Sequence, residues 1–248
     1  MNTVEARVSG RSFNWPLASQ SFYFWMAVLI SLLVISSFSL TVGENLIYPT
    51  PPRPALLYIH AIVFFVWVAL FLTQTALIGN RNLRLHRKLG LAGAYFGAVV
   101  PVIGVLTTLV MADFNETQLG TSRERVETFL IIPLNDMLCF TPAFALAVWW
   151  RKRPEFHRRF MFIATCTMTA AAFARFPFMS IPALRFHAGV DLLILLGVAR
   201  DLIKDRRIHP VYLYAVPLLL AVQVVVMTLY LTQSQWWREI ARGLIGLV

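Results

Sequence analysis

Long apolar stretches dominate this chain and restrict its fold more than any other feature. A helix needs roughly 20 apolar residues to cross about 30 Å of hydrocarbon, with a usual range of ~17–25. Seven stretches reach or approach that length, at about residues 21–43, 56–79, 89–111, 129–150, 160–178, 187–203 and 211–232. In lipid, a spanning segment must satisfy its own backbone hydrogen bonds. We therefore expect an all-α fold, a polytopic membrane bundle of seven transmembrane helices.

The composition also favours a lipid environment. Only 14% of the 248 residues are charged and 58% are hydrophobic, whereas a soluble domain carries about 25% charged residues. The net charge of +10 is spread over short clusters between the apolar stretches. This placement is typical of membrane orientation and argues against nucleic-acid binding. Cys139 and Cys166 lie inside apolar stretches and form no CxxC pair, so we expect buried, free thiols.

The positions of lysine and arginine predict how the chain is oriented. Fifteen of the 22 Lys and Arg residues belong to the N-terminal tail and the second, fourth and sixth connections, and seven belong to the other side. The positive-inside rule then places the N-terminus in the cytoplasm and the C-terminus in the periplasm. We divide the chain into a cytoplasmic tail (1–20), a seven-helix membrane domain (21–232) and an amphipathic interfacial tail (233–248).

Ionisable residues within the apolar stretches are the first candidates for function, because lipid should have excluded them. At about 1.5 Å of rise per residue, five of them lie within one or two turns of the periplasmic boundary. They come from four different stretches and are His60, Asp136, Arg175, His187 and Asp191. His187 and Asp191 are four residues apart and share a helix face, so the carboxylate could orient the imidazole.

This polar layer admits three interpretations. It could bind a cofactor, either haem with His60 and His187 as ligands, or zinc or another divalent metal. The candidate metal ligands are His60, His187, Asp136 and Asp191. It could instead be a structural network without a cofactor, in which Arg175 neutralises Asp136 or Asp191. The third interpretation is a transport pathway.

A second pair of histidines comes from two related segments, LHRKLG and FHRRFM, which begin the third and fifth stretches. If those helices are neighbours, His86 and His157 could face one another across a haem at the cytoplasmic side. The arginines that could meet its propionates are Arg87, Arg158 and Arg159. Cationic residues at the mouth of a helix also serve orientation alone. The two segments are therefore membrane anchors first and candidate ligands second.

The run from Tyr58 to Gly90, YIHAIVFFVWVALFLTQTALIGNRNLRLHRKLG, resembles a group of uncharacterised bacterial multi-pass membrane proteins. The later RKRPEFHRRFMFIAT and RRIHP are also similar. The resemblance covers roughly residues 58–210, and it implies the bacterial inner membrane but no particular activity. A weaker likeness is to the di-haem transmembrane b-type cytochromes, which place two histidine pairs at opposite faces of a helix bundle.

The cytochrome likeness implies haem b at an outer pair, His60 with His187, and at an inner pair, His86 with His157. Those cytochromes draw their ligands from four consecutive helices, whereas the fourth stretch here has no histidine. Both inner histidines also lie at the extreme ends of their helices. These departures weaken the inner haem site more than the outer one.

The sequence is compatible with three classes of function, and it does not decide whether the chain is an enzyme. The first is a redox protein that carries b haems and exchanges electrons with a membrane partner or a quinone. The second is a non-catalytic assembly factor, transporter or small-ligand sensor. The third is a metal-dependent intramembrane hydrolase, in which a bound metal activates water. No phosphate loop, G-x-S-x-G elbow or H-E-x-x-H zinc helix is present to narrow the choice.

Overall fold

A computed structural model describes residues 22–179 and 185–247, and all regular elements in these ranges are helices. The elements are α1 (Phe22–Ser39), the π-helix η1 (Gly43–Ile47), α2 (Ala55–Gly79), α3 (Leu83–Thr117), α4 (Arg123–Phe129), α5 (Ile131–Trp149), α6 (Pro154–Thr167), α7 (Ala170–Phe173), α8 (Arg185–Asp205), α9 (Pro210–Leu231) and α10 (Gln235–Ile245). The all-α prediction is confirmed. The expected cytoplasmic tail, 1–20, lies outside the described residues.

Five helical segments of the described chain are long and apolar enough to cross a membrane: α1, α2, α3, the α4–α5 segment Arg123–Trp149, and α9. They correspond to the first four and the seventh of the expected stretches. The fifth expected stretch is interrupted, because α6 ends at Thr167 and the four-residue α7 follows it. The sixth corresponds to α8, which is long but carries charged residues near both ends.

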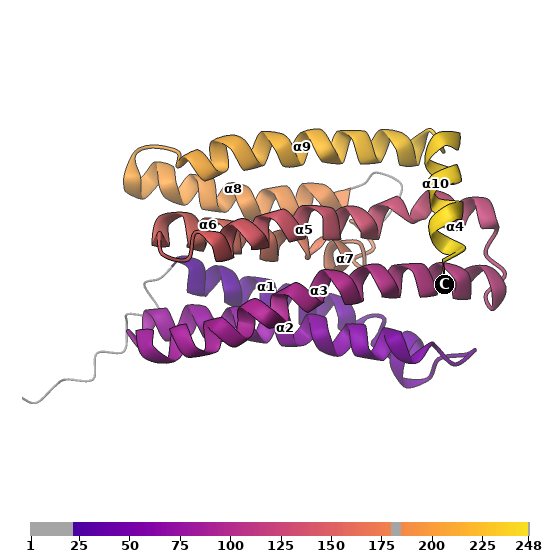
Figure 1. Cartoon of the computed structure of the whole chain (residues 1–248), viewed down its shortest axis with the longest axis horizontal. Coiled ribbons are helices and arrows are strands. Elements are labelled where there is room, and N and C mark those ends of the chain that lie inside the picture. Colours follow the sequence, from indigo (N-terminus) through magenta and orange to yellow (C-terminus); the bar gives the residue numbers. More distant parts are fainter. Residues whose placement is uncertain (1–21, 180–184, 248) are drawn as a thin grey trace, which may run out of the picture.

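The helices form an elongated bundle in which most of them run along the long axis (Figure 1). α2 packs against α3, and α5 packs against α6. α1 contacts α2 and α7, while α8 contacts α6, α7 and α9. α10 runs across one end of the bundle, where it packs on α4 (Figure 1). We call this the α10 end, and we call the opposite end, which holds His86, His157 and Arg159, the basic end.

Close packing in the middle of the bundle depends on glycine. A Cβ at Gly97 of α3 would lie 2.3 Å from the Phe144 ring and 2.8 Å from the Trp67 ring. Trp67 in turn meets Phe140 and Phe144 edge to face, with ring centroids 5.2 and 5.4 Å away. Gly97 therefore lets α3 approach α2 and α5 closely enough to hold the Trp67 indole in one place.

Candidate functional site: a polar cavity near the α10 end

A cavity of about 1160 Å³ lies between α1, α2, α3, α5 and α7. Ile30, Val34 and Val68 form apolar walls in its deeper part, toward the middle of the bundle. Ser122 and Gln233, from the segments that begin α4 and α10, line it at the α10 end. Three of the five ionisable residues of the predicted outer layer also line it, namely His60, Asp136 and Arg175.

Several polar side chains in this cavity have no hydrogen-bond partner among the described residues. The unpaired buried atoms are His60 Nδ1, Trp67 Nε1 and Thr107 Oγ1. Trp67 is only 3% exposed and Thr107 only 5%. The Asp136 carboxylate likewise has no hydrogen bond or ion pair within the described chain. Since buried polar groups are nearly always paired, these four groups need partners from water or from a ligand.

The sequence around Asp136 directs its side chain into the cavity. Pro133 stands in the first turn of α5, where its missing N–H costs no helix bond, and Pro142 stands inside the helix, where it removes one. One turn from the first proline, Met137 packs so closely on α3 that a Cβ at Gly104 would lie 2.4 Å from its sulfur. This contact holds α5 against α3 and leaves Asp136 on the cavity wall beside it.

Arg175 follows α7 and lines the same cavity. Its Nε donates to Thr41 Oγ1 at 3.1 Å, and its Nη1 donates to the Ala171 carbonyl. The guanidinium carbon lies 3.8 Å from the centroid of the Phe38 ring, a cation–π contact. No ion pair links Arg175 to Asp136, although both side chains line the cavity. An acidic and a basic side chain thus line one space without pairing with each other.

The outer histidines have different surroundings. His60 stacks on Phe64, with ring centroids 4.0 Å apart, and lines the cavity. His187 is buried with Nε2 unpaired, and it is not among the residues that line the cavity. Asp191 makes no hydrogen bond to His187 but accepts one of 2.9 Å from Gln223 of α9. The predicted layer therefore separates into a cavity group and a group on α8.

The inner histidines, by contrast, lie side by side at the basic end. The rings of His86 and His157 have centroids 6.5 Å apart, with their planes at 79°. Nδ1 of His157 is hydrogen-bonded to the Ala147 carbonyl at 2.8 Å. The side-chain amide of Gln74 lies against Nδ1 of His86. Each ring is oriented through Nδ1, which leaves Nε2 for another partner. The role of this pair as cofactor ligands stays a prediction.

Of the arginines proposed for haem propionates, two already have other partners. Arg158 pairs with Glu155 and lies over the Tyr23 ring, 5.5 Å from its centroid. Arg159 belongs to an ion-pair network described next. Arg87 is exposed at the start of α3. The arginine cluster in FHRRFM therefore contributes to packing at the basic end as well as to charge.

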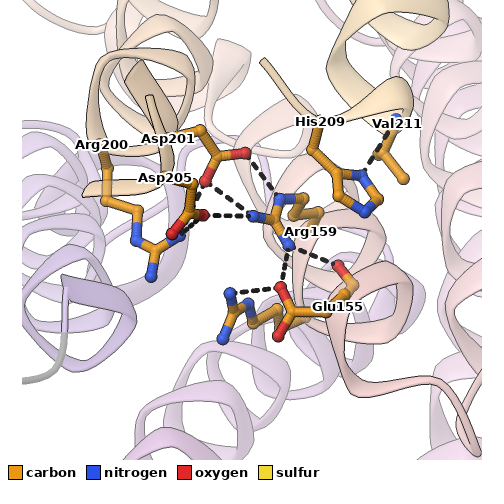
Figure 2. Close-up of polar contacts among 8 residues, drawn as sticks. Glu155, Arg159, Arg200, Asp201, Asp205, His209 and Val211 are labelled. Carbon is orange, nitrogen blue, oxygen red and sulfur yellow. Dashed lines mark hydrogen bonds and ion pairs between the residues drawn. The ribbon is translucent and has the colours of Figure 1, made fainter. Parts of the chain in front are cut away.

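The network around Arg159 was not anticipated from the sequence (Figure 2). Arg159 is 1% exposed, and its Nε and Nη2 each donate to one oxygen of Asp201, which is 0% exposed, both at 2.8 Å. Glu155 accepts from Nη1 at 2.7 Å, and Asp205 accepts from Nη2 at 3.3 Å. Arg200 pairs with both aspartates at 2.8 Å. The sequence carries one signal of this network, because residues four apart, such as Asp201 and Asp205, share a helix face; it does not identify their partner.

A second ion-pair cluster joins α10 to α4. The buried Glu127 carboxylate accepts from Arg123 at 3.1 Å, from Arg238 at 3.3 Å and from Arg242 at 2.9 Å. Trp237 also donates from Nε1 to the Glu127 carbonyl at 2.9 Å. The C-terminal tail was expected to lie flat on the membrane interface. α10 runs across the end of the bundle (Figure 1), which is compatible with that expectation, and it is docked there through its Trp237 face.

The chemistry that these groups offer is polar contact within an apolar enclosure. In the described residues, no three His, Cys, Asp or Glu side chains gather closely enough to hold a metal ion. The cavity instead presents the carboxyl group of Asp136, the imidazole of His60, the guanidinium of Arg175, an indole N–H and a hydroxyl, and it is also lined by the exposed Glu124 and Arg125. No family model, curated protein or solved structure matches this chain.

Proposed function

We propose that the chain crosses the bacterial cytoplasmic membrane seven times, with α6–α7 and α8 as the fifth and sixth crossings. Figure 1 supports this, because α6 and α8 lie along the same axis as the five apolar helices. The lysine and arginine distribution supports a cytoplasmic basic end and a periplasmic α10 end.

Single cysteines test this topology in a variant that lacks Cys139 and Cys166. The positions Arg81 and Gln235 are exposed at the basic end and the α10 end. A membrane-impermeant maleimide should label Gln235→Cys in intact cells, and it should label Arg81→Cys only after lysis. Labelling of both in intact cells, or of Arg81→Cys alone, would refute the orientation.

We further propose that the protein reversibly binds an amphipathic small molecule in this cavity, as a transporter or ligand sensor. The observation that supports it is the convergence of unpaired polar groups, including two nearly fully buried ones, on one large cavity. Buried polar groups that serve stability alone are hydrogen-bonded within the protein. Polar groups of a binding site can lack a partner until a ligand binds, at a cost in stability. The apolar inner walls would contact the apolar part of the ligand, and the polar groups would set its orientation.

The cavity favours binding over the cofactor chemistries that the sequence also suggested. His60 is the one histidine among its described lining residues, whereas a bis-histidine haem takes two. A catalytic zinc ion takes three protein ligands, and His187 and Asp191 do not line this cavity. Binding needs none of these complete ligand sets.

Asp136→Leu tests whether the cavity is a binding site or a structural network. If Asp136 serves ligand binding and not the fold, the melting temperature of the purified variant is equal to or higher than that of the wild type, because an unpaired buried carboxyl group is removed. It also loses at least tenfold of the amphiphile that copurifies with the wild type, measured by mass spectrometry after denaturation. Asp191→Leu is the matched control, since it breaks the bond to Gln223 outside the cavity; it should lower stability and keep the amphiphile.

Two results would overturn the proposal. The first is a large loss of stability in Asp136→Leu, which would make this residue part of a structural network. The second is wild-type protein that neither carries an amphiphile nor gains stability from a membrane lipid extract. Trp67→Phe gives an independent check, because it removes the indole N–H and keeps an aromatic ring among Phe140 and Phe144.

A second candidate function, haem binding at the inner pair, is favoured by the position of His86 and His157. At metal–nitrogen distances of about 2.0–2.1 Å, two imidazoles on opposite sides of one metal have ring centroids roughly 6 Å apart. The observed separation is 6.5 Å. A dithionite-reduced minus oxidised spectrum of protein from haem-supplemented cells tests this. Haem bands that are lost in His86→Ala and kept in His209→Asn would support it, and a spectrum without haem bands would remove it.

A further inference from the structure

Besides the histidine, four acidic or basic side chains line the cavity, and two of them point to the class of ligand. Glu124 and Arg125 are exposed, and Glu124 pairs with Arg238, whereas Asp136 and Arg175 are partly buried. Asp136 comes from α5 and Arg175 from the segment after α7, and both line the same space. They are not paired with each other or with an opposite charge elsewhere in the described chain. A carboxyl group or a guanidinium in an apolar setting is stabilised in its charged form by an opposite charge or by hydrogen bonds, and an unpaired carboxyl group takes its neutral form instead. A ligand that brings both charges would satisfy the two side chains at once.

Arg175 is prepared to bind an anion. Its Nε and Nη1 are occupied by Thr41 and the Ala171 carbonyl, while Nη2 has no partner among the described residues. Stacking on Phe38 fixes the plane of the guanidinium group, so that less side-chain freedom is lost when an anion binds. A phosphate or carboxylate is the group that suits this geometry.

Asp136 is free to bind a cation or a strong hydrogen-bond donor. Both of its oxygens lack a partner within the described chain, and no arginine or lysine contacts it. Aromatic rings also line the cavity, among them Phe64, Phe65 and Trp67. Aromatic faces together with one carboxylate are the usual surroundings of a bound ammonium group.

The remaining walls determine the rest of the ligand. Toward the middle of the bundle the cavity is lined by Ile30, Val34 and Val68, and at the α10 end by Ser122 and Gln233. Its volume of about 1160 Å³ exceeds the ~300–1,000 Å³ of pockets that take drug-sized molecules. An apolar chain can therefore lie deep in the cavity while a polar head group stays near the α10 end.

We propose that the cavity selects a zwitterionic amphiphile, with its anionic group on Arg175, its cationic group on Asp136 and its apolar chain along Ile30 and Val34. This inference rests on the proposed function and adds to it the charge of the head group. The same head-group chemistry occurs on a membrane lipid and on a water-soluble solute. The apolar inner walls favour the lipid-like form.

Four amphiphiles of one chain length test the selectivity: zwitterionic hexadecylphosphocholine, anionic palmitate, cationic hexadecyltrimethylammonium and neutral monopalmitoylglycerol. Their affinities for purified protein in a non-ionic detergent are measured by thermophoresis. We expect the zwitterion to bind at least tenfold more tightly than each of the others. Glycerophosphocholine, which lacks the chain, should bind at least tenfold more weakly than hexadecylphosphocholine.

Charge variants assign each end of the head group. Asp136→Asn should reduce the preference for the zwitterion over palmitate to less than threefold, because the site for the cationic group is lost. Arg175→Gln should do the same for the preference over hexadecyltrimethylammonium. Monopalmitoylglycerol should bind both variants as it binds the wild type, which shows that they are folded. Asp191→Asn, outside the cavity, should leave every preference unchanged. If Asp136→Asn does not fold, Asp136→Ser gives the same comparison.

The outcomes distinguish failure of the zwitterion inference from failure of the proposed amphiphile binding. If all four amphiphiles bind equally, or if the variants keep the wild-type preference, the zwitterion inference is overturned and amphiphile binding stands. If monopalmitoylglycerol and the other three all fail to bind, the proposed function is overturned as well. Glycerophosphocholine binding as tightly as hexadecylphosphocholine would overturn the lipid-like form of the ligand.

Discussion

Asp201→Asn is the substitution whose effect the structure predicts most directly. Asp201 accepts two parallel hydrogen bonds of 2.8 Å from Arg159, and both side chains are buried. Asparagine keeps the shape of the residue. It loses the negative charge, and it places an N–H group against one of the Arg159 donors. The arginine would then be a buried cation without its main partner.

The expected loss of stability follows from what remains around Arg159. Removing one partner of a buried ion pair costs about 3–5 kcal/mol. Glu155 still accepts from Arg159 at 2.7 Å and Asp205 at 3.3 Å, so we expect the lower end, about 3 kcal/mol. For a chain of this size, about 1 kcal/mol lowers the melting temperature by roughly 2–4 °C. The predicted decrease is therefore about 6–12 °C.

Thermal unfolding in mild detergent, followed by tryptophan fluorescence, measures this decrease. Asp205→Asn is the matched control, because the Asp205 side chain is 39% exposed and its contact with Arg159 is 3.3 Å; it should cost less than about 1 kcal/mol. The double variant Arg159→Met, Asp201→Leu should recover most of the loss, because no buried charge is left unpaired. Equal losses in Asp201→Asn and Asp205→Asn, or no recovery in the double variant, would refute this reasoning.

Three further predictions follow from single contacts. Glu127→Gln weakens the cluster that holds α10 on α4. Limited proteolysis should therefore release the C-terminal segment at least several-fold faster than in the wild type. An unchanged rate would show that the Trp237 face alone holds α10. Gly97→Val should lower stability by about 1–3 kcal/mol, because even a Cβ would lie 2.3 Å from Phe144, and a melting temperature equal to the wild type would contradict the close packing. His209 caps α9 by accepting from the Val211 N–H at 3.2 Å, and burial, aided by the charge of Arg159, lowers the pKa of its imidazole. The neutral imidazole therefore stabilises the fold above the ordinary pKa of about 6.5, and this effect is lost as the pH falls through the lowered pKa. Asparagine retains a cap but does not titrate. The melting temperature of His209→Asn should therefore drop less between neutral and acidic pH than that of the wild type.

Helix positions could largely be predicted from the sequence, because they depend on local apolar runs. The first four stretches and the seventh correspond to helices with the length and hydropathy of membrane spans. The fifth was drawn as one helix over residues 160–178, but the helix ends at Thr167. Thr165, Thr167 and Thr169 each bond a backbone carbonyl through the side chain there, and such bonds compete with the helix ladder. Hydropathy alone does not report that competition.

The candidate site was only partly predictable. Depth along each helix identified His60, Asp136 and Arg175 as polar groups near one boundary, and the structure places all three on one cavity. The same reasoning grouped His187 and Asp191 with them, whereas Asp191 faces Gln223 on α9. Depth is set by the distance along the helix. Direction is set by the rotation of each helix about its axis, which the sequence of one helix does not determine.

The amino-acid order was enough to predict a helical membrane protein with a basic end and with polar residues near the other end, because hydropathy, helix length and charge placement are properties of each segment taken alone. Packing between distant segments decided which of those residues share a cavity, which two histidines meet and which aspartate holds Arg159. Asp201 is 42 residues from Arg159 along the chain, and Trp237 is 110 residues from Glu127. Such pairs form only when the helices that carry them pack together, and that packing depends on the whole bundle.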